Sequence, residues 1–186
     1  MARVPYVDAV DGVAPPDLVA LYADIAGLRG SVLNLYRALG NQPAALRAFM
    51  GMSRYIRDDA ALPADLRELA VLVTGYALDA PYEQYHHVPA ARRAGVSEAK
   101  LAALPTWAAA GDLFTATERA VLAYAEQVSH TRTVDDATWA SLQALLPQGQ
   151  LIDLALTVGW YHLCAAVLGP LQIETEDVAP GPQAPG

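Results

Sequence analysis

Apolar residues recur every three or four positions along most of the chain, which is the spacing of an amphipathic α-helix. Leu18, Leu21 and Ile25 show this spacing near the start, and residues 64–78 are apolar around most of a helix circumference. The pattern predicts helical segments at about residues 18–27, 32–39, 43–57, 64–78, 81–94, 98–104, 119–128, 135–146 and 150–168. No stretch shows the alternation of a half-buried strand. We therefore predict an all-α fold, a single-domain helical bundle of about eight or nine helices.

Residues that favour helix starts stand before several of these segments. Thr115 and Glu118 have the spacing of a capping box, in which each residue binds the backbone of the other. Single capping residues are predicted ahead of four other helices, at Ser31, at Ser97, at Asp135 or Asp136, and at Asp79 before Pro81.

The two ends of the chain lack this periodicity. Proline interrupts residues 1–15, and the last residues read GPQAPG. We expect an N-terminal arm at 1–15, a helical domain at 16–170 and a partly disordered tail at 171–186.

Composition and charge narrow the class of protein. The chain has 186 residues, of which 54% are hydrophobic and 17% charged, so a large apolar surface has to be buried. We expect part of it to lie in a homo-oligomer interface. The net charge is −8 and the 12 Lys and Arg residues form no basic run, which argues against nucleic-acid binding.

Three further observations bear on the compartment. Cys164 is the only cysteine, so no disulfide can form within the chain. The N-terminus MARVPYVDAV lacks the apolar core of a signal peptide. The apolar run 151–169 contains Asp153 and His162 and ends in Gly-Pro, which favours a buried core helix over a membrane span. We expect a soluble, cytoplasmic protein without a membrane partner.

The ionisable residues that do not look like simple surface groups gather in residues 67–95, where two predicted helices meet. Glu83 and His87 are four residues apart and share a helix face. Glu68 lies on the preceding helix, which runs antiparallel. With a rise of about 1.5 Å per residue, His87 falls between the two carboxylates along the axis, about 6 Å from each.

An imidazole between two carboxylates is a workable proton relay. One Glu can orient the ring while the other exchanges a proton with a substrate. Apolar neighbours would raise the pKa of such a carboxyl and make it an acid near neutral pH. The same Glu-x-x-x-His spacing is also common in simple surface pairs, and Glu68 near a helix start suits the helix dipole for structural reasons alone. Both interpretations stay open at this point.

The same residues resemble a known family. RELAVL followed by PYEQYHHVPAARRAGVS is similar to the signature of the carboxymuconolactone decarboxylase and alkylhydroperoxidase-D superfamily, and the similarity extends over about residues 15–170. In the peroxidase branch the motif is Glu, then Cys-x-x-Cys, then His. Glu68 and His87 match it, but Ala80 and Glu83 stand at the two cysteine positions. A thiol peroxidase needs both thiols, so that activity is not expected.

The resemblance implies a helical subunit that assembles as a trimer or hexamer and works without metal or organic cofactor, as the decarboxylase branch does. It implies a lyase or isomerase acting on a small carboxylated or lactone-type substrate. Glu83 would be the general acid or base, His87 its partner and Glu68 the orienting group. Residues proposed to bind the substrate are His86, Arg37 and Tyr82, with Arg92 as a second choice for a carboxylate.

Two alternatives remain beside this hypothesis. The chain is a non-catalytic binding or interaction protein that kept the family core and lost the cysteines, or it holds a metal through Glu83, His87 and either His86 or His162.

Overall fold

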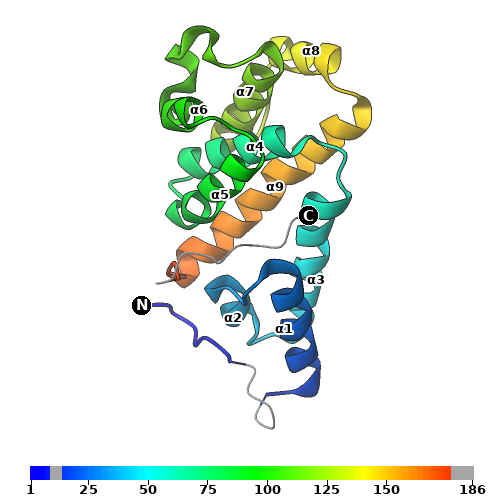
Figure 1. The fold of residues 1–186 in the computed structure, drawn as a ribbon, viewed down its shortest axis with the longest axis vertical. Helices are drawn as coiled ribbons and strands as arrows, with labels where there is room; N and C mark the ends of the chain where they lie inside the picture. The colour runs from blue at the N-terminus through cyan, green and yellow to red at the C-terminus, as the bar shows by residue number, and fades with distance from the viewer. Residues whose placement is uncertain (9–13, 177–186) are drawn as a thin grey trace. The chain divides into compact units, whose positions relative to one another are not determined.

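The computed structural model describes residues 1–8 and 14–176, and these residues form nine α-helices and no β-strand (Figure 1). The α-helices are α1 (Pro16–Arg29), α2 (Asn34–Leu39), α3 (Pro43–Arg54), α4 (Ala64–Ala77), α5 (Pro81–Arg93), α6 (Glu98–Ala103), α7 (Ala116–Thr131), α8 (Asp136–Leu145) and α9 (Gln148–Leu171). Three short turns complete them, namely the π-helical η1 (Tyr55–Asp59) and the 3₁₀ helices η2 (Leu104–Ala109) and η3 (Gly111–Leu113). The predicted all-α fold of eight or nine helices is confirmed.

The chain divides into two compact units. An N-terminal unit comprises Met1–Asp58 with Leu168–Gly186, and a central unit comprises Asp59–Val167. The predicted boundaries at residues 15 and 170 stay a prediction. Part of the predicted arm, 9–13, and most of the predicted tail, 177–186, lie outside the described residues.

The N-terminal unit brings both ends of the described chain together. The backbone N–H of Arg3 donates to the carbonyl of Leu171 at 2.9 Å, and that of Asn34 donates to the carboxylate of Glu176 at 2.6 Å. The buried Tyr22 hydroxyl donates to the Tyr36 carbonyl at 3.2 Å or to that of residue 7 at 3.0 Å. This hydroxyl occupies the space where a side chain at Gly40 would begin, which requires glycine there.

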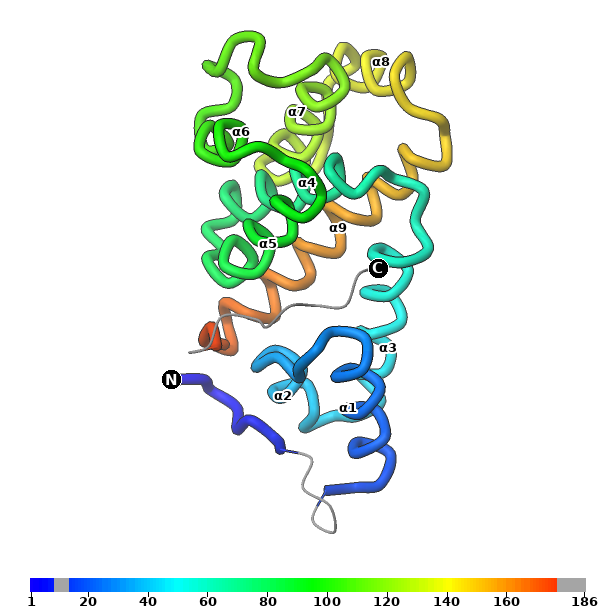
Figure 2. The backbone as a smooth tube through the Cα atoms, viewed as in Figure 1, coloured from blue at the N-terminus to red at the C-terminus, as the bar shows by residue number. Residues whose placement is uncertain are grey.

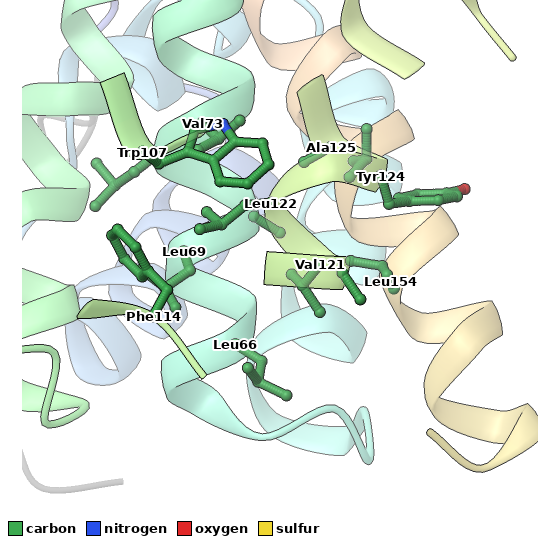
Figure 3. Packing of buried hydrophobic residues seen from close by; sticks show 14 of the residues in the cluster. Leu66, Leu69, Val73, Trp107, Phe114, Val121, Leu122, Tyr124, Ala125 and Leu154 are labelled. Carbon is green, nitrogen blue, oxygen red and sulfur yellow. The ribbon is translucent and has the colours of Figure 1, made fainter. Parts of the chain in front are cut away.

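The central unit is built around α4, which packs against both α5 and α7 (Figures 1 and 2). Most of its residues from Leu66 to Gly75 are buried, as the apolar circumference predicts. Figure 3 shows Leu69 and Val73 of α4 facing Trp107, Phe114 and Leu122 in one continuous core. A helix that contacts neighbours on several sides cannot shift alone, so α4 is a rigid support for polar groups placed on it.

The long helix α9 contains the apolar run that the sequence shows. Within the described residues it is the one helix whose length and composition would allow it to cross a membrane, with a mean hydropathy of 1.7 over its most apolar window. Half of that window is buried inside the structure. Asp153 is buried too, and its carboxylate accepts the backbone N–H of Ala61 at 2.7 Å. The charge inside the apolar run thus holds the segment that leads into α4.

Most of the predicted helix starts are confirmed. Thr115 and Glu118 form the capping box, Ser97 caps α6 and Asp135 caps α8. The predictions for Ser31 and Asp79 are wrong. Leu33 is the N-cap of α2 and Ala80 is the N-cap of α5, and no side chain caps either helix. Asp79 instead adopts a positive φ of 49°, which turns the chain between α4 and α5.

The capping box predicts how stability depends on pH. Burial alone would raise the pKa of Glu118, but hydrogen bonds from Lys100 and Thr115 outweigh it and lower the pKa. A lowered carboxyl pKa stabilises the fold above the ordinary pKa, and the contribution is lost as pH falls through the folded value. Lys100→Met is therefore expected to lower the free energy of unfolding by about 1 kcal/mol at neutral pH, as measured by urea denaturation.

The difference between wild type and Lys100→Met should shrink as the pH falls below the ordinary carboxyl range. A difference that stays constant from pH 7 to pH 3 would show that the ion pair with Glu118 is not its source. Arg47→Met is the control, because it removes a cation from a weak, exposed pair in which Arg47 lies 3.9 Å from Asp17.

Candidate active site

The α4–α5 hairpin positions the three ionisable residues that the sequence singles out. The left-handed Asp79 lets the N–H of Ala80 donate to the Gly75 carbonyl at 2.8 Å, and Pro81 then occupies the first turn of α5. The two helices approach closely, since a Cβ at Gly75 would lie 3.6 Å from the Cβ of Glu83. This spacing directs Glu68 of α4 and His87 of α5 toward each other.

The structure brings Glu68, His87 and Glu83 together as expected. His87 Nδ1 lies 2.6 Å from Glu68 Oε2, and His87 Nε2 lies 3.5 Å from Glu83 Oε2. All three residues are buried, with exposed fractions of 3% for Glu68, 2% for His87 and 5% for Glu83. The imidazole therefore lies between two carboxylates, away from bulk water, and we call these three residues the Glu–His–Glu triad.

This geometry constrains the protons of the triad. A contact of 2.6 Å between a ring nitrogen and a carboxyl oxygen needs a proton between them. Arg67 beside Glu68 favours the ionised carboxylate, which places this proton on Nδ1. A neutral imidazole would then present the lone pair of Nε2 to the Glu83 oxygen, and two acceptors repel in a buried site. A second proton removes the repulsion, either on Nε2 or on the Glu83 carboxyl. The arrangement therefore favours a triad that holds two protons.

Two further residues contact the triad, and the sequence predicts neither of these contacts. Arg67 Nε lies 3.4 Å from Glu68 Oε1, so a cation supports the ionised form of Glu68. The Tyr161 ring of α9 meets the His87 ring edge to face at a centroid distance of 4.8 Å. Tyr161 is buried and distant in sequence, and no spacing rule connects a residue on α9 to the hairpin.

The predicted substrate-binding residues on α5 form a separate aromatic group. The His86 ring lies 4.6 Å from the ring of Tyr82 and 5.0 Å from that of Tyr85. Tyr82 is buried and His86 is half-buried. These residues lie on the same helix as Glu83 and contact one another. The substrate-binding role predicted for His86 and Tyr82 stays a prediction.

The two arginines considered for a substrate carboxylate already have acidic partners. Arg37 belongs to the N-terminal unit, where it binds Asp8 at 2.8 Å and the Asn34 side chain at 2.8 Å. Arg92 binds Glu98 at 2.6 Å on the exposed surface, and this hydrogen bond lowers the pKa of the Glu98 carboxyl. The role predicted for Arg37 stays a prediction.

The ligand set considered for a metal does not converge in the described residues. They contain no group of three or more His, Cys, Asp or Glu side chains placed to hold a metal ion. His162 Nε2 lies 3.1 Å from the Ser129 hydroxyl, which itself donates to the Ala125 carbonyl at 2.6 Å. A hydroxyl has one proton, so His162 is the donor in that contact and Ser129 is not activated as a nucleophile.

The positions of the missing cysteines lie in this hairpin. Ala80 is the buried N-cap of α5, and Glu83 follows it within the first turn. Cys164 is buried in α9, and it is the only thiol of the chain. A disulfide exchange cycle within one chain needs a second thiol, which this sequence does not supply.

Comparison with solved structures supports the fold. An AhpD-core, peroxidase-related protein from Ralstonia eutropha JMP134 is 19% identical, with a TM-score of 0.80 over 95% of this chain and 93% of that one. A Cys-to-Ala variant of the debrominase Bmp8, in complex with 2,3,4-tribromopyrrole, is 20% identical, with a TM-score of 0.79 over 97% and 96%. A peroxidase-related protein from Silicibacter sp. TM1040 is 17% identical, with a TM-score of 0.79 over 97% and 98%.

Comparison of sequences gives a family match over part of the chain. No curated protein matches the chain. Residues 43–127 match the Carboxymuconolactone decarboxylase family, and this range contains Glu68, Glu83 and His87. With one cysteine, the chain cannot contain a Cys-x-x-Cys motif. The chain therefore has an AhpD-like fold, and over residues 43–127 it is similar to the carboxymuconolactone decarboxylase family.

Proposed function

We propose that the Glu–His–Glu triad transfers protons without a cofactor, and that the protein is a lyase or isomerase acting on a small carboxylated or lactone-type substrate. The observation that carries the proposal is the position of His87, whose two ring nitrogens each face a buried carboxylate oxygen, at 2.6 Å and 3.5 Å. Such a site stores a proton close to a group that can deliver it.

The residues have distinct roles in this proposal. Glu68, which contacts Arg67, accepts a hydrogen bond from Nδ1–H and so fixes the orientation of the His87 ring. Glu83 exchanges a proton with the substrate. His87 Nε2 restores the protonation state of Glu83 after each exchange. Tyr161 restricts the tilt of the ring from the α9 side through its edge-to-face contact.

Decarboxylation of a lactone acid illustrates how bonds, electrons and protons balance in this reaction. The bond between the substrate carbon and its carboxylate breaks, CO₂ leaves, and the electron pair moves into the conjugated lactone carbonyl. The resulting enolate takes a proton from Glu83 at carbon. The net reaction consumes one proton per CO₂ released, which the triad supplies and solvent replaces. Isomerisation uses the same groups, with removal of a proton at one carbon and its return at another.

We further propose that Tyr82 and His86 contact the substrate. Their rings lie on α5 beside Glu83, and an aromatic pair of this kind can receive the flat face of an unsaturated lactone. Thiol peroxidase activity is disfavoured, because Ala80 and Glu83 stand at the two cysteine positions of the peroxidase-branch motif.

Burial of the triad also favours a second candidate, a non-catalytic member in which Glu68, His87 and Glu83 are only a structural network. Exposed fractions of 2–5% mean that a substrate reaches Glu83 only if neighbouring side chains give way. The two candidates make different predictions for substitution of each Glu.

Glu83→Gln keeps the size of the side chain and removes its proton. We expect turnover of carboxymuconolactone, followed by CO₂ release, to fall by about 10²–10⁴-fold, the usual contribution of a general acid. The thermal midpoint should change little, since the amide can still donate to Nε2. Glu98→Gln, in an exposed pair with Arg92, is the matched control. Unchanged turnover in Glu83→Gln would remove Glu83 from the chemistry.

Glu68→Gln tests the orienting role. The amide is a weaker acceptor for Nδ1–H and leaves Arg67 without its neighbouring charge, so the free energy of unfolding should fall by about 1–3 kcal/mol. Turnover should also fall, with kcat affected more than KM, because the ring loses its fixed tautomer. If stability falls in Glu68→Gln while neither Glu variant changes turnover, the network is structural only.

We also propose that the protein is a homo-oligomer and that α9 contributes to the interface. Ile152, Leu156 and Leu163 are 60%, 37% and 47% exposed and follow one another at helical spacing. Leu163→Glu should shift the mass measured by light scattering after size exclusion toward that of one chain, and Arg47→Met should not. A wild-type protein that elutes as a single chain would contradict this proposal.

A further inference from the structure

A cavity lies between α7 and α8 in the central unit, and none of its lining residues belongs to the Glu–His–Glu triad. Its volume is about 320 Å³, and η2 closes one side with Trp107. The size is at the small end of the range for ligand sites in proteins. Alanine supplies four of the eight lining residues, so the groove stays open because its side chains are short.

The charge of the cavity has one sign. Among the described residues that line the cavity, Arg119 is the one with an ionisable side chain, and none is acidic. The guanidinium is fixed in place, because Nη1 donates to the Gly111 carbonyl at 2.8 Å and the group lies over the Trp107 ring at 5.7 Å. The neighbouring residue Glu118 forms an ion pair with Lys100, in which Oε1 lies 2.5 Å from Nζ. In a chain of net charge −8, this cation is available to a ligand anion.

Two hydroxyls lie in the lining of the cavity. Thr138 Oγ1 accepts from the Gln127 amide at 3.1 Å and donates its proton to the Asp135 carboxylate, so this proton is not available to a ligand. Ser141 Oγ donates to the Ala137 carbonyl at 2.9 Å, so its remaining capacity is as an acceptor. The Arg119 guanidinium suits a carboxylate, and the Ser141 oxygen suits a ligand hydroxyl.

From these features we propose that the α7–α8 cavity binds a small planar monocarboxylate with an aromatic or unsaturated body. The carboxylate binds Arg119, and the apolar body lies against Trp107 and the alanines. This site is additional to the triad and does not depend on the proposed lyase activity. It gives the protein a place to bind an organic acid as an effector or to hold it as a second ligand.

The test is a titration of the full-length, ¹⁵N-labelled protein with sodium benzoate, observed through the indole N–H signals of its three tryptophans. The Trp107 signal is assigned with Trp107→Phe. We expect a saturable shift of the Trp107 signal with a Kd at or below about 1 mM. Benzyl alcohol has the same ring without the charge and should bind at least about tenfold more weakly.

Two variants locate the ligand. Arg119→Met keeps the aliphatic stem and should weaken benzoate binding at least about tenfold. Ala137→Leu fills the groove from its exposed wall, keeps Arg119, and should abolish the shift even if Arg119→Met folds poorly. Arg47→Met removes an equal charge elsewhere and should bind as wild type does. The proposal is overturned if benzoate produces no saturable shift, if benzyl alcohol binds equally well, or if Ala137→Leu binds as tightly as wild type.

Discussion

The buried hydrogen bond between His87 Nδ1 and Glu68 connects the stability of this fold with its proposed chemistry. Burying a carboxylate and an imidazole is costly unless each satisfies the other. The α4–α5 hairpin meets this condition, because core residues such as Leu69 and Val73 fix α4 while Gly75 allows α5 to approach closely. The same burial encloses His87 Nε2 and the Glu83 carboxyl oxygen, which lie 3.5 Å apart. The contact with Glu68 fixes the orientation of the His87 ring, and this orientation determines how Nε2 and Glu83 share a proton.

The two cysteine positions of the family motif carry different side chains here, and each has a physical consequence. Ala80 is buried at the start of α5, where it provides no nucleophile. Glu83 places a carboxyl 3.5 Å from His87 Nε2, where the resemblance would place a thiol. A carboxyl donates and accepts protons but does not form disulfides. The side chains at these two positions therefore allow proton transfer but no disulfide exchange.

The helices and the meeting of Glu68, His87 and Glu83 could be predicted, because the 3.6-residue period and the 1.5 Å rise are properties of the backbone alone. Other features depend on tertiary contacts and could not. Asp79 adopts a left-handed conformation instead of capping α5. Tyr161 reaches His87 from α9, far along the chain. Arg92 pairs with Glu98, which lies beyond the end of α5. The cavity beside Arg119 forms only when α7 and α8 pack together.

The proton content of the Glu–His–Glu triad tests this account most directly. Nitrogen-15 NMR of His87, together with carbon-13 NMR of the Glu68 and Glu83 carboxyl groups, reports how many protons the three side chains hold at neutral pH. We predict two, one on Nδ1 facing Glu68 and one shared between Nε2 and Glu83. A neutral imidazole with a single proton, flanked by two ionised carboxylates, would contradict the account.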